Sequence, residues 1–283
     1  MQVQEALERF VVQLRADGRS EHTIRQYQRH VRLLAKWLGS TEIERVDHES
    51  LAVFLGTPVA RCRPDGREKK PTAMNALRTS LRCFFAFVHA AGYSRTNPAR
   101  LIRRAICSDS PPRALTEEEE ERLVAELARA PERERVLFTL MLRTGLRLGS
   151  ALALEIEDVE LHACELRIRH AKGGREEISF IPEALVDDLE RWIGVRSEGP
   201  LFPSPSGARL SGRHARRLFA ALLESARVFR VQGTHVLRHT LGDRLYRETG
   251  DIELVRSALR HRSIASTTVY ARCSKDRVRA ALG

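Results

Sequence analysis

The sequence has few features of membrane or secreted proteins. Aromatic residues make up only 6% of its 283 residues. No apolar run approaches the ~18–20 residues that a membrane span needs. The N-terminus, MQVQEALERF, carries acidic residues and lacks the apolar stretch of a signal peptide. We therefore expect a cytoplasmic protein that has no membrane partner.

Cysteine and lysine are also scarce. The five cysteines are scattered and form no CxxC pair, which argues against a disulfide framework and against a cysteine-based zinc site. Only five of the 48 basic residues are lysines, and Lys172 is the only lysine between residues 71 and 274. Lysine can release a proton when its pKa is lowered, whereas arginine cannot near neutral pH. Lys172 is therefore a candidate for proton transfer, although a solvated turn residue is the simpler interpretation.

Positive charge is the most prominent property of the composition. The net charge is +11 and the isoelectric point is about 10.1, which favours a polyanionic partner such as nucleic acid. Residues 1–104 hold 19 basic against 10 acidic residues, residues 105–199 hold 13 against 21, and residues 200–283 hold 16 against 6. The basic segments at 1–104 and 200–283 could form two basic surfaces that bind one DNA duplex from two sides. A basic surface that serves solubility alone is the alternative.

The first third of the chain is predicted to be helical. Apolar spacing predicts helices over residues 3–14, from Ser20 to Gly39 and over residues 72–91, and Asn97-Pro98 begins a last short helix. Residues 56–71 form a polar loop, and CSDSPPR at 107–113 resembles a linker. We therefore predict a helical DNA-binding domain over residues 1–106, a linker over 107–114 and a second domain over 115–283.

The second domain is predicted to be mixed. Thr116 and Glu119 form a capping box, so the acidic run at 117–121 indicates a helix start rather than a metal site. Alternating apolar residues at 166–170 and at Ile178 and Phe180 predict a β-hairpin within residues 159–181 that turns at Gly173-Gly174. Further helices are predicted over residues 134–143, 183–195, 212–226, 235–249, 252–259 and 266–272. The fold class is therefore α with a small β-hairpin or sheet.

Candidate chemical residues are weak when each is taken alone. Arg147 ends the segment TGLR, where a structural arginine is the ordinary interpretation. His235 and Arg238 share a helix face at i and i+3. His239, four residues after His235, suggests zinc, but the glutamate of an HExxH site and a nearby third ligand are missing. A lone tyrosine such as Tyr270 is usually a packing residue.

The order of these residues is far more specific than any one of them. The second domain contains five short motifs in a fixed order: TGLR, a hairpin lysine, HVLRH, LRH and TTVYAR. The chain here resembles the tyrosine recombinase family, the phage integrases and Xer-type recombinases. The first domain resembles the family's helical, SAM-like core-binding domain through SEHTIRQYQRHVRLLAKWL and NALRTSLRCFFAFVHAAG. The six catalytic positions implied by the resemblance are Arg147, Lys172, His235, Arg238, His261 and Tyr270.

The resemblance implies DNA strand exchange through a covalent 3′-phosphotyrosyl intermediate. Tyr270 would be the nucleophile, and Arg147 and Arg238 would clamp the phosphate oxygens, because guanidinium forks match phosphate geometry. Lys172 would protonate the leaving 5′-oxygen, and the two histidines would act as acid, base or hydrogen-bond donor. No metal and no other cofactor are required, since the phosphotyrosine stores the energy of the cut bond.

Two positions depart from the family pattern. The family usually has Ser-Glu two and three residues after its first arginine, and this chain has Gly149 and Ser150. The family's Leu-Gly-His appears here as Leu259-Arg260-His261. We expect the first position to lack the family's glutamate contact that orients neighbouring groups, and the second to have a changed backbone conformation or DNA contact.

The predicted partner is double-stranded DNA. The polar face of the helix at 72–91 is expected to read a groove, while basic residues before it and in the second domain contact phosphates. The expected DNA contacts are Lys69, Lys70, Asn75, Arg78, Arg82, Arg175, Arg213, Arg216 and Arg217. The tail after Tyr270 is expected to pass to a neighbouring subunit. This exchange would give a homotetramer on two DNA sites, with or without a second recombinase or accessory factor.

Two other functions stay open at this point. A type IB topoisomerase-like enzyme would use the same chemistry to relax DNA, and a DNA-binding regulator would have lost activity. The first predicted helix begins almost at Met1, so we expect a simple recombinase without a separate arm-binding domain. Prophage integration, chromosome-dimer resolution, integron capture and transposon movement fit the sequence equally.

Overall fold

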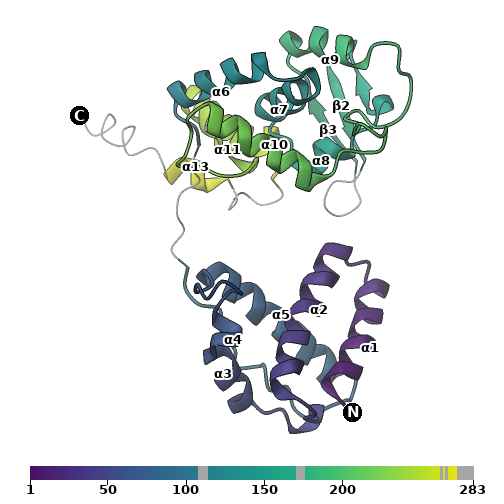
Figure 1. Ribbon diagram of the computed structural model, residues 1–283, viewed down its shortest axis with the longest axis vertical. Coiled ribbons are helices and arrows are strands. Elements are labelled where there is room, and N and C mark those ends of the chain that lie inside the picture. The colour runs from purple at the N-terminus through teal and green to yellow at the C-terminus, as the bar shows by residue number, and fades with distance from the viewer. Residues whose placement is uncertain (108–113, 170–175, 262–263, 265–266, 273–283) are drawn as a thin grey trace, which may run out of the picture. The chain divides into compact units, whose positions relative to one another are not determined.

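The computed structural model describes residues 1–107, 114–169, 176–261, 264 and 267–272 (Figure 1). The chain divides into two compact units, Met1–Asp109 and Ser110–Gly283. Helices predominate among these residues. A three-stranded antiparallel sheet lies in the second unit, with the strands in the order β1 (Val159–Glu160), β2 (Glu165–Ile168) and β3 (Glu177–Phe180). The predicted fold class is confirmed. Within the described residues, no helix is long and apolar enough to cross a membrane.

The first unit is a helical bundle around its own apolar core. Ser20 caps the second helix by accepting a hydrogen bond from the Thr23 amide, as its position in the sequence predicts. The aromatic rings of Phe10, Phe84 and Phe85 meet edge to face where α1 and α5 pack, with centroids 5.0–5.6 Å apart. The helices are α1 (Val3–Ala16), α2 (Glu21–Leu38), α3 (His48–Gly56), α4 (Pro58–Arg61) and α5 (Pro71–Ala90), with a 3₁₀ turn η1 (Ile43–Arg45).

Two local predictions for this unit are wrong. The polar loop at 56–71 contains the short helix α4, which Thr57 caps and which starts at Pro58. A proline at the first helical position loses no hydrogen bond, so it begins a helix as readily as it marks a loop. The segment after Asn97 is a hydrogen-bonded turn rather than a helix.

The second unit builds helices around the small sheet. The buried core includes Phe138 of α7 and Phe219 of α10, with ring centroids 5.0 Å apart. The elements are α6 (Glu117–Arg129), α7 (Glu132–Thr144), α8 (Leu148–Ala153), η2 (Ile156–Asp158), β1 (Val159–Glu160), β2 (Glu165–Ile168), β3 (Glu177–Phe180), η3 (Glu183–Leu185), α9 (Val186–Ile193), α10 (Gly212–Ser225), α11 (His235–Thr249), α12 (Ile252–Ala258) and α13 (Thr268–Arg272).

The hairpin register differs from the apolar pattern of the sequence. Strands β2 and β3 pair antiparallel with Leu166 opposite Ser179, so these two residues share the buried face. Ile178 and Phe180 therefore point outward and are 55% and 70% exposed. The alternation of Ile178 and Phe180 predicts that these two residues face the core, and this prediction is wrong. The buried residue of β3 is Ser179. The predicted turn at Gly173-Gly174 lies outside the described residues.

The acidic start of α6 serves as a helix cap and as an anchor for α11. The capping box of Thr116 and Glu119 is present, as predicted. Glu119 also pairs with Arg230, and Glu120 lies 2.7 Å from Arg244 of α11. The pair of Glu120 and Arg244 holds the N-terminal end of α6 against α11, which carries the candidate catalytic residues His235 and Arg238.

The end of α7 requires a glycine. Gly145 caps the helix with φ of +65°, a conformation that L side chains rarely adopt. A Cβ at this position would also lie 2.7 Å from Leu259 Cδ2 and 3.0 Å from Leu241 Cδ2. The chain therefore turns sharply and in close contact with neighbouring helices just before Arg147.

Candidate active site

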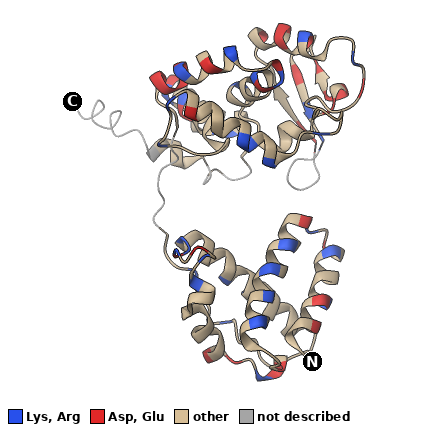
Figure 2. Ribbon diagram, viewed as in Figure 1, with Lys and Arg blue, Asp and Glu red and all other residues tan. Residues whose placement is uncertain are grey.

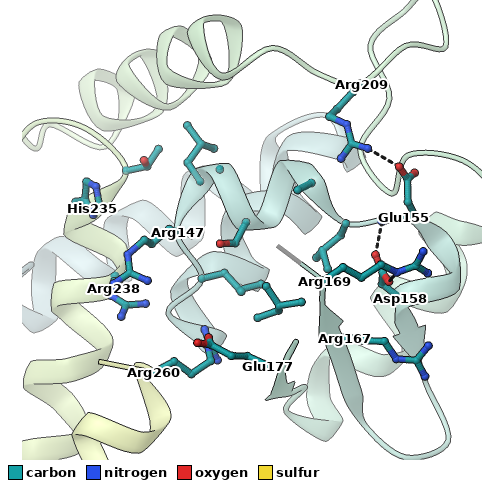
Figure 3. A pocket seen from close by; sticks show the side chains of 18 of the residues that line it. Arg147, Glu155, Asp158, Arg167, Arg169, Glu177, Arg209, His235, Arg238 and Arg260 are labelled. Carbon is teal, nitrogen blue, oxygen red and sulfur yellow. Dashed lines mark hydrogen bonds and ion pairs between the residues drawn. The ribbon is translucent and has the colours of Figure 1, made fainter. Parts of the chain in front are cut away.

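A pocket of about 810 Å³ in the second unit gathers most of the candidate catalytic residues (Figure 3). Its walls come from the segment after α7, from β2 and β3, from the start of α11 and from the segment after α12. Among the described residues, the lining is strongly basic, with seven arginines against three carboxylates. These residues are Arg147, Arg167, Arg169, Arg209, Arg216, Arg238 and Arg260, and Glu155, Asp158 and Glu177.

The carboxylates neutralise only part of this charge. Asp158 lies 2.5 Å from the Arg169 Nε atom, and Glu155 pairs with Arg209 (Figure 3). Within the described part of the chain, no carboxylate lies within ion-pair distance of Arg147. The pocket therefore keeps a positive field and suits an anion such as a phosphate group.

Arg238 is the most buried of these arginines, with 4% of its surface exposed. Its Nη1 atom donates to the Gly145 carbonyl at 2.5 Å, and its Nη2 atom donates to the Leu259 carbonyl. A guanidinium has five N–H groups, so three remain for a ligand. Burial, with Arg147 and Arg260 nearby, lowers the pKa of Arg238 to about 9. The group therefore stays charged at neutral pH.

Arg147 approaches the same space from another element. It is exposed at the N-terminal end of α8, directly after the turn at Gly145. Figure 3 shows Arg147 beside Arg238, with His235 next to both. Two guanidinium groups thus face one pocket from two helices, and this arrangement can hold the two non-bridging oxygens of a phosphodiester.

The two histidines of the pocket are neutral near pH 7 in the free protein. Burial, together with Arg238 and Arg147, lowers the pKa of His235 at the start of α11. Burial and the same arginines lower the pKa of His261 to about 4. The His261 Nδ1 atom shares a 2.8 Å hydrogen bond with the Thr267 hydroxyl. Each neutral ring can offer one N–H group to a bound phosphate.

Tyr270 of α13 lies beside the arginine pocket, and it is not among the described residues that line the pocket. Only 2% of its surface is exposed. Its ring stacks on His261 with centroids 6.5 Å apart and planes 6° apart. The ring also covers Gly242 of α11, where a Cβ would lie 2.6 Å from the tyrosine Cζ atom. The glycine therefore provides the space that the tyrosine ring fills.

His239 contacts the tyrosine hydroxyl and was missed by sequence reasoning. Its Nδ1 atom lies 3.1 Å from the Tyr270 hydroxyl oxygen. Burial, with His235 and Arg238 nearby, lowers the pKa of His239 to about 4, so at neutral pH the ring is uncharged and one of its nitrogens has a free lone pair. From the sequence, His239 was a candidate only for zinc binding. The useful signal was the i, i+3 spacing to Gly242, because a glycine leaves room for a ring next to the histidine.

Other candidate positions have mixed outcomes. Gly149 and Ser150, the first departure from the family pattern, both line the pocket. Lys172 and Arg175 lie outside the described residues. Within the described residues, no group of three or more His, Cys, Asp or Glu side chains is arranged to hold a metal ion.

Asn75 is not on the exposed face of α5, so the expected groove contact is wrong. The residue is 4% exposed. Its amide nitrogen donates to the Ala105 carbonyl at 2.9 Å, and its amide oxygen accepts from the Ala105 backbone N–H at 2.8 Å. Asn75 therefore anchors the segment that leaves the first unit, and its hydrogen-bonding groups are used inside the protein.

The basic residues of the first unit divide by exposure. Lys70 and Arg82 are exposed, and Arg78 is half-buried with its Nη1 atom 3.4 Å from the Asn75 amide oxygen. The Lys69 Nζ atom donates to the Ala60 carbonyl at 2.6 Å, and burial lowers the pKa of this lysine. Lys70 and Arg82 are thus the more accessible candidates for phosphate contact.

Helix α10 carries an exposed basic track in the second unit (Figure 2). Arg213, Arg216 and Arg217 are all exposed on this helix. Arg216 also lines the arginine pocket, so the track continues into the candidate active site. The Arg217 Nη2 atom donates a hydrogen bond to the His214 Nδ1 atom at 2.9 Å.

Comparison with known proteins identifies the family of the chain. The model of the phage integrase family matches residues 113–277, which is more than half of the sequence. This chain belongs to the phage integrase family. The model of the family's N-terminal SAM-like domain matches residues 7–92, within the first unit.

Named relatives agree with this membership. Tyrosine recombinase XerC of Thermodesulfovibrio yellowstonii is 26% identical over 267 residues, which cover 89% of this chain and 86% of the relative. The fold is similar to that of the XerH site-specific recombinase in a post-cleavage complex with a difH substrate, with a TM-score of 0.76, 21% identity and coverage of 98% and 83%. It is also similar to a lambda integrase tetramer bound to a Holliday junction, with a TM-score of 0.73, 19% identity and coverage of 93% and 78%.

The family membership confirms the predicted enzyme class and function. The chain is a DNA strand-transferring enzyme of the tyrosine recombinase type, which carries out site-specific recombination through a tyrosine intermediate. Related recombinases are solved on DNA, one of them as a tetramer.

Proposed function

We propose that the chain cuts DNA strands with Tyr270 and rejoins them to new partners. The observation that supports this most strongly is the position of one helix, α11. Its Arg238 faces the arginine pocket, and its His239 contacts the Tyr270 hydroxyl at 3.1 Å. Two consecutive residues of one helix thus contact the nucleophile and form part of the phosphate clamp. Movement of the buried ring toward the pocket would bring the hydroxyl oxygen to the phosphorus atom.

The pocket arginines would stabilise the transition state. A phosphodiester carries one negative charge, and its pentacoordinate transition state carries more. Arg147 and Arg238 would hold the non-bridging oxygens, while His235 and His261 would each donate an N–H group. Bound phosphate would raise the pKa of both histidines, because it supplies the negative charge that the free pocket lacks.

The proton of the tyrosine would pass to His239. The phenol has a pKa near ~10 and is mostly neutral at pH 7, so it needs a proton acceptor. His239 is neutral and within hydrogen-bond distance. His239 would thus take the acid–base role with the tyrosine that was expected of His235. Lys172 would protonate the leaving 5′-oxygen.

Replacing His239 by Gln is expected to slow strand cleavage by about 10²–10⁴-fold, because an amide keeps a polar contact but accepts no proton. The measurement is single-turnover cleavage of a nicked duplex that traps the covalent adduct. His162→Gln is the matched control, since His162 is exposed in the turn before β2. Cleavage by His239→Gln within about threefold of wild type would show that another group takes the proton.

The reaction products distinguish a recombinase from a topoisomerase, because only a recombinase joins strands of two different DNA molecules. Two labelled duplexes, taken from DNA that flanks the encoding gene, are incubated with the protein together with a supercoiled plasmid that carries the same site. We expect junctions that combine the two labels. Relaxed plasmid without combined junctions would favour a topoisomerase-like activity, and DNA binding without any covalent adduct would favour a regulator.

The proposed assembly is a homotetramer on two double-stranded DNA sites in the cytoplasm. Exchange between two duplexes needs four cleaved strands, and each subunit supplies one tyrosine. Exposed basic residues of both units, among them Arg82 and Arg213, would contact the DNA backbone. A second recombinase or an accessory factor would be compatible with this assembly.

A further inference from the structure

His261 can serve the proposed phosphate clamp through only one of its two ring nitrogens. Its Nδ1 atom lies 2.8 Å from the Thr267 hydroxyl, so this nitrogen is already engaged inside the protein. The residue also lines the pocket that contains Arg147 and Arg238. The nitrogen that remains for a bound phosphate is therefore Nε2.

The position of one proton decides whether Nε2 can donate. Burial and the neighbouring arginines lower the pKa of His261 to about 4, so the ring is neutral at pH 7. In a neutral imidazole, one nitrogen donates a hydrogen bond and the other accepts one. Nε2 can donate to a phosphate oxygen only when Nδ1 carries no proton, and Nδ1 then needs a hydrogen-bond donor of its own.

Thr267 is placed to be that donor. Its surface is 0% exposed, and within the described part of the chain its hydroxyl has no other hydrogen-bond partner. A hydroxyl group carries one hydrogen and rotates to suit its acceptor. When the Thr267 hydroxyl donates to Nδ1, the proton of the ring stays on Nε2, the nitrogen that is left for the phosphate.

Thr267 also supports the helix that carries the nucleophile. The Tyr270 backbone N–H donates to the Thr267 carbonyl at 3.0 Å, and the Thr267 backbone N–H donates to the Ile264 carbonyl at 2.7 Å. The Tyr270 ring stacks on His261 with planes 6° apart. The backbone of Thr267 thus supports the start of α13, while its hydroxyl holds the imidazole. A substitution that removes only the hydroxyl leaves the backbone contacts in place.

We infer that Thr267 is a positioning residue that fixes the ring proton of His261 on Nε2, so that Nε2 donates to a non-bridging oxygen of the cleaved phosphodiester. This inference deepens the proposed function and rests on it. Thr267 is fully buried, and it is not among the described residues that line the pocket. It therefore acts through His261 rather than on the DNA.

The first test locates the proton in the free protein by NMR. The full chain is labelled with ¹⁵N at its histidines, and the signals of His261 are identified by their absence from the spectrum of His261→Ala. We expect wild type at pH 7 to carry the ring proton on Nε2. A proton on Nδ1 would overturn the inference, whatever the protein does to DNA. This measurement needs no variant of Thr267, so it stands even if such a variant folds poorly.

The second test compares two substitutions of Thr267 in single-turnover cleavage of the nicked duplex. Valine has the shape of threonine without the hydroxyl, whereas serine keeps the hydroxyl and loses the methyl group. We expect Thr267→Val to cleave about 5–30-fold more slowly than wild type, and Thr267→Ser to stay within about threefold. Thr249→Val is the matched control and should cleave as wild type does, because the Thr249 hydroxyl is exposed and donates within α11.

The order of the two Thr267 variants distinguishes positioning of the proton from packing. A residue that only fills space would tolerate valine better than serine, since valine keeps the buried volume. Faster cleavage by Thr267→Val than by Thr267→Ser, or equal rates for the two, would therefore overturn the inference.

His261→Ala separates this inference from the proposed function. Alone, it is expected to slow cleavage by about 10²-fold, because one phosphate donor is lost. Adding Thr267→Val should then change the rate by less than about twofold, since the effect of Thr267 passes through the ring. Wild-type cleavage by His261→Ala would overturn the donor role of His261 in the proposed function. Slow cleavage by His261→Ala that Thr267→Val slows again by its full factor would overturn only the role of Thr267.

Discussion

Tyr270→Phe is expected to abolish the covalent protein–DNA adduct, with cleavage falling by at least about 10⁴-fold, as when other enzymes lose their nucleophile. The variant lacks the only atom that would bond to phosphorus. The measurement uses nicked duplexes tiled from the DNA that flanks the encoding gene, with wild type and variant compared on a denaturing gel. A shifted band in wild type alone identifies the nucleophile and locates the cleavage site.

The structure makes this a clean substitution. The Tyr270 ring packs on His261 and Gly242, and phenylalanine keeps that packing. The hydrogen bond to His239 is lost, at a cost of about 1 kcal/mol. Tyr246→Phe is the matched control, because Tyr246 packs against the same small apolar cluster. It should form the adduct as wild type does.

The possible contrary results have distinct meanings. A band that survives Tyr270→Phe would mean that another residue attacks the phosphate. A band absent from wild type, despite specific DNA binding, would point to a missing partner subunit or to an inactive regulator. Either result would leave the fold and family unchanged, since neither depends on the identity of the nucleophile.

Local features of the fold were predictable because short-range chemistry determines them. Ser20 and Thr116 cap helices through their own side chains, and both were recognised from the sequence. The start of α11 at His235 and its end at Thr249 also agree with the prediction. Apolar spacing shows which face of a helix is buried. It therefore predicts the helices themselves but not the contacts between them.

Features that depend on distant partners were not predictable in the same way. Asn75 has the spacing of a polar helix face, but Ala105, thirty positions away, takes its hydrogen bonds. Phe180 alternates like a core residue, yet the pairing with β2 turns it outward. His239 contacts Tyr270, which lies on another helix. In each case a contact between remote segments decides the side chain's environment.

The same limit applies to Arg260. The sequence identified the position as a departure from glycine, but the contact with Ser179 required the packing of β3. A family pattern marks where a chain is unusual, and the structure then shows which neighbours accommodate the change. The residue types of the candidate site can therefore be recognised in the sequence, while the contacts that support them cannot.

Arg238→Ala is expected to reduce both catalysis and stability. Loss of a phosphate-clamping guanidinium should slow cleavage by about 10²–10³-fold or more. The variant also leaves the Gly145 and Leu259 carbonyls without their donor, and each such buried group costs about 1–3 kcal/mol. We therefore expect the free energy of unfolding to fall by about 2–4 kcal/mol.

Arg147→Ala provides the comparison that separates the two effects. Arg147 is exposed, so its removal should slow cleavage by a similar factor of about 10²–10³ while changing stability by less than about 0.5 kcal/mol. Urea unfolding, followed by Trp192 fluorescence in a Trp37→Phe background, reports on the second unit alone. Cleavage is measured on the nicked duplex below the unfolding transition.

Both variants are thus expected to cleave slowly, but only Arg238→Ala is expected to lose stability. Equal losses of stability would mean that the carbonyl contacts of Arg238 contribute little to the packing of α11 against the turn at Gly145. Unchanged cleavage by Arg147→Ala would mean that a single guanidinium suffices for the phosphate. Arg238→Lys decides between charge and geometry, because an ammonium group keeps the charge but its donors, all on one nitrogen, cannot span the positions that the planar guanidinium reaches. We expect it to behave like Arg238→Ala in cleavage and to recover only part of the lost stability.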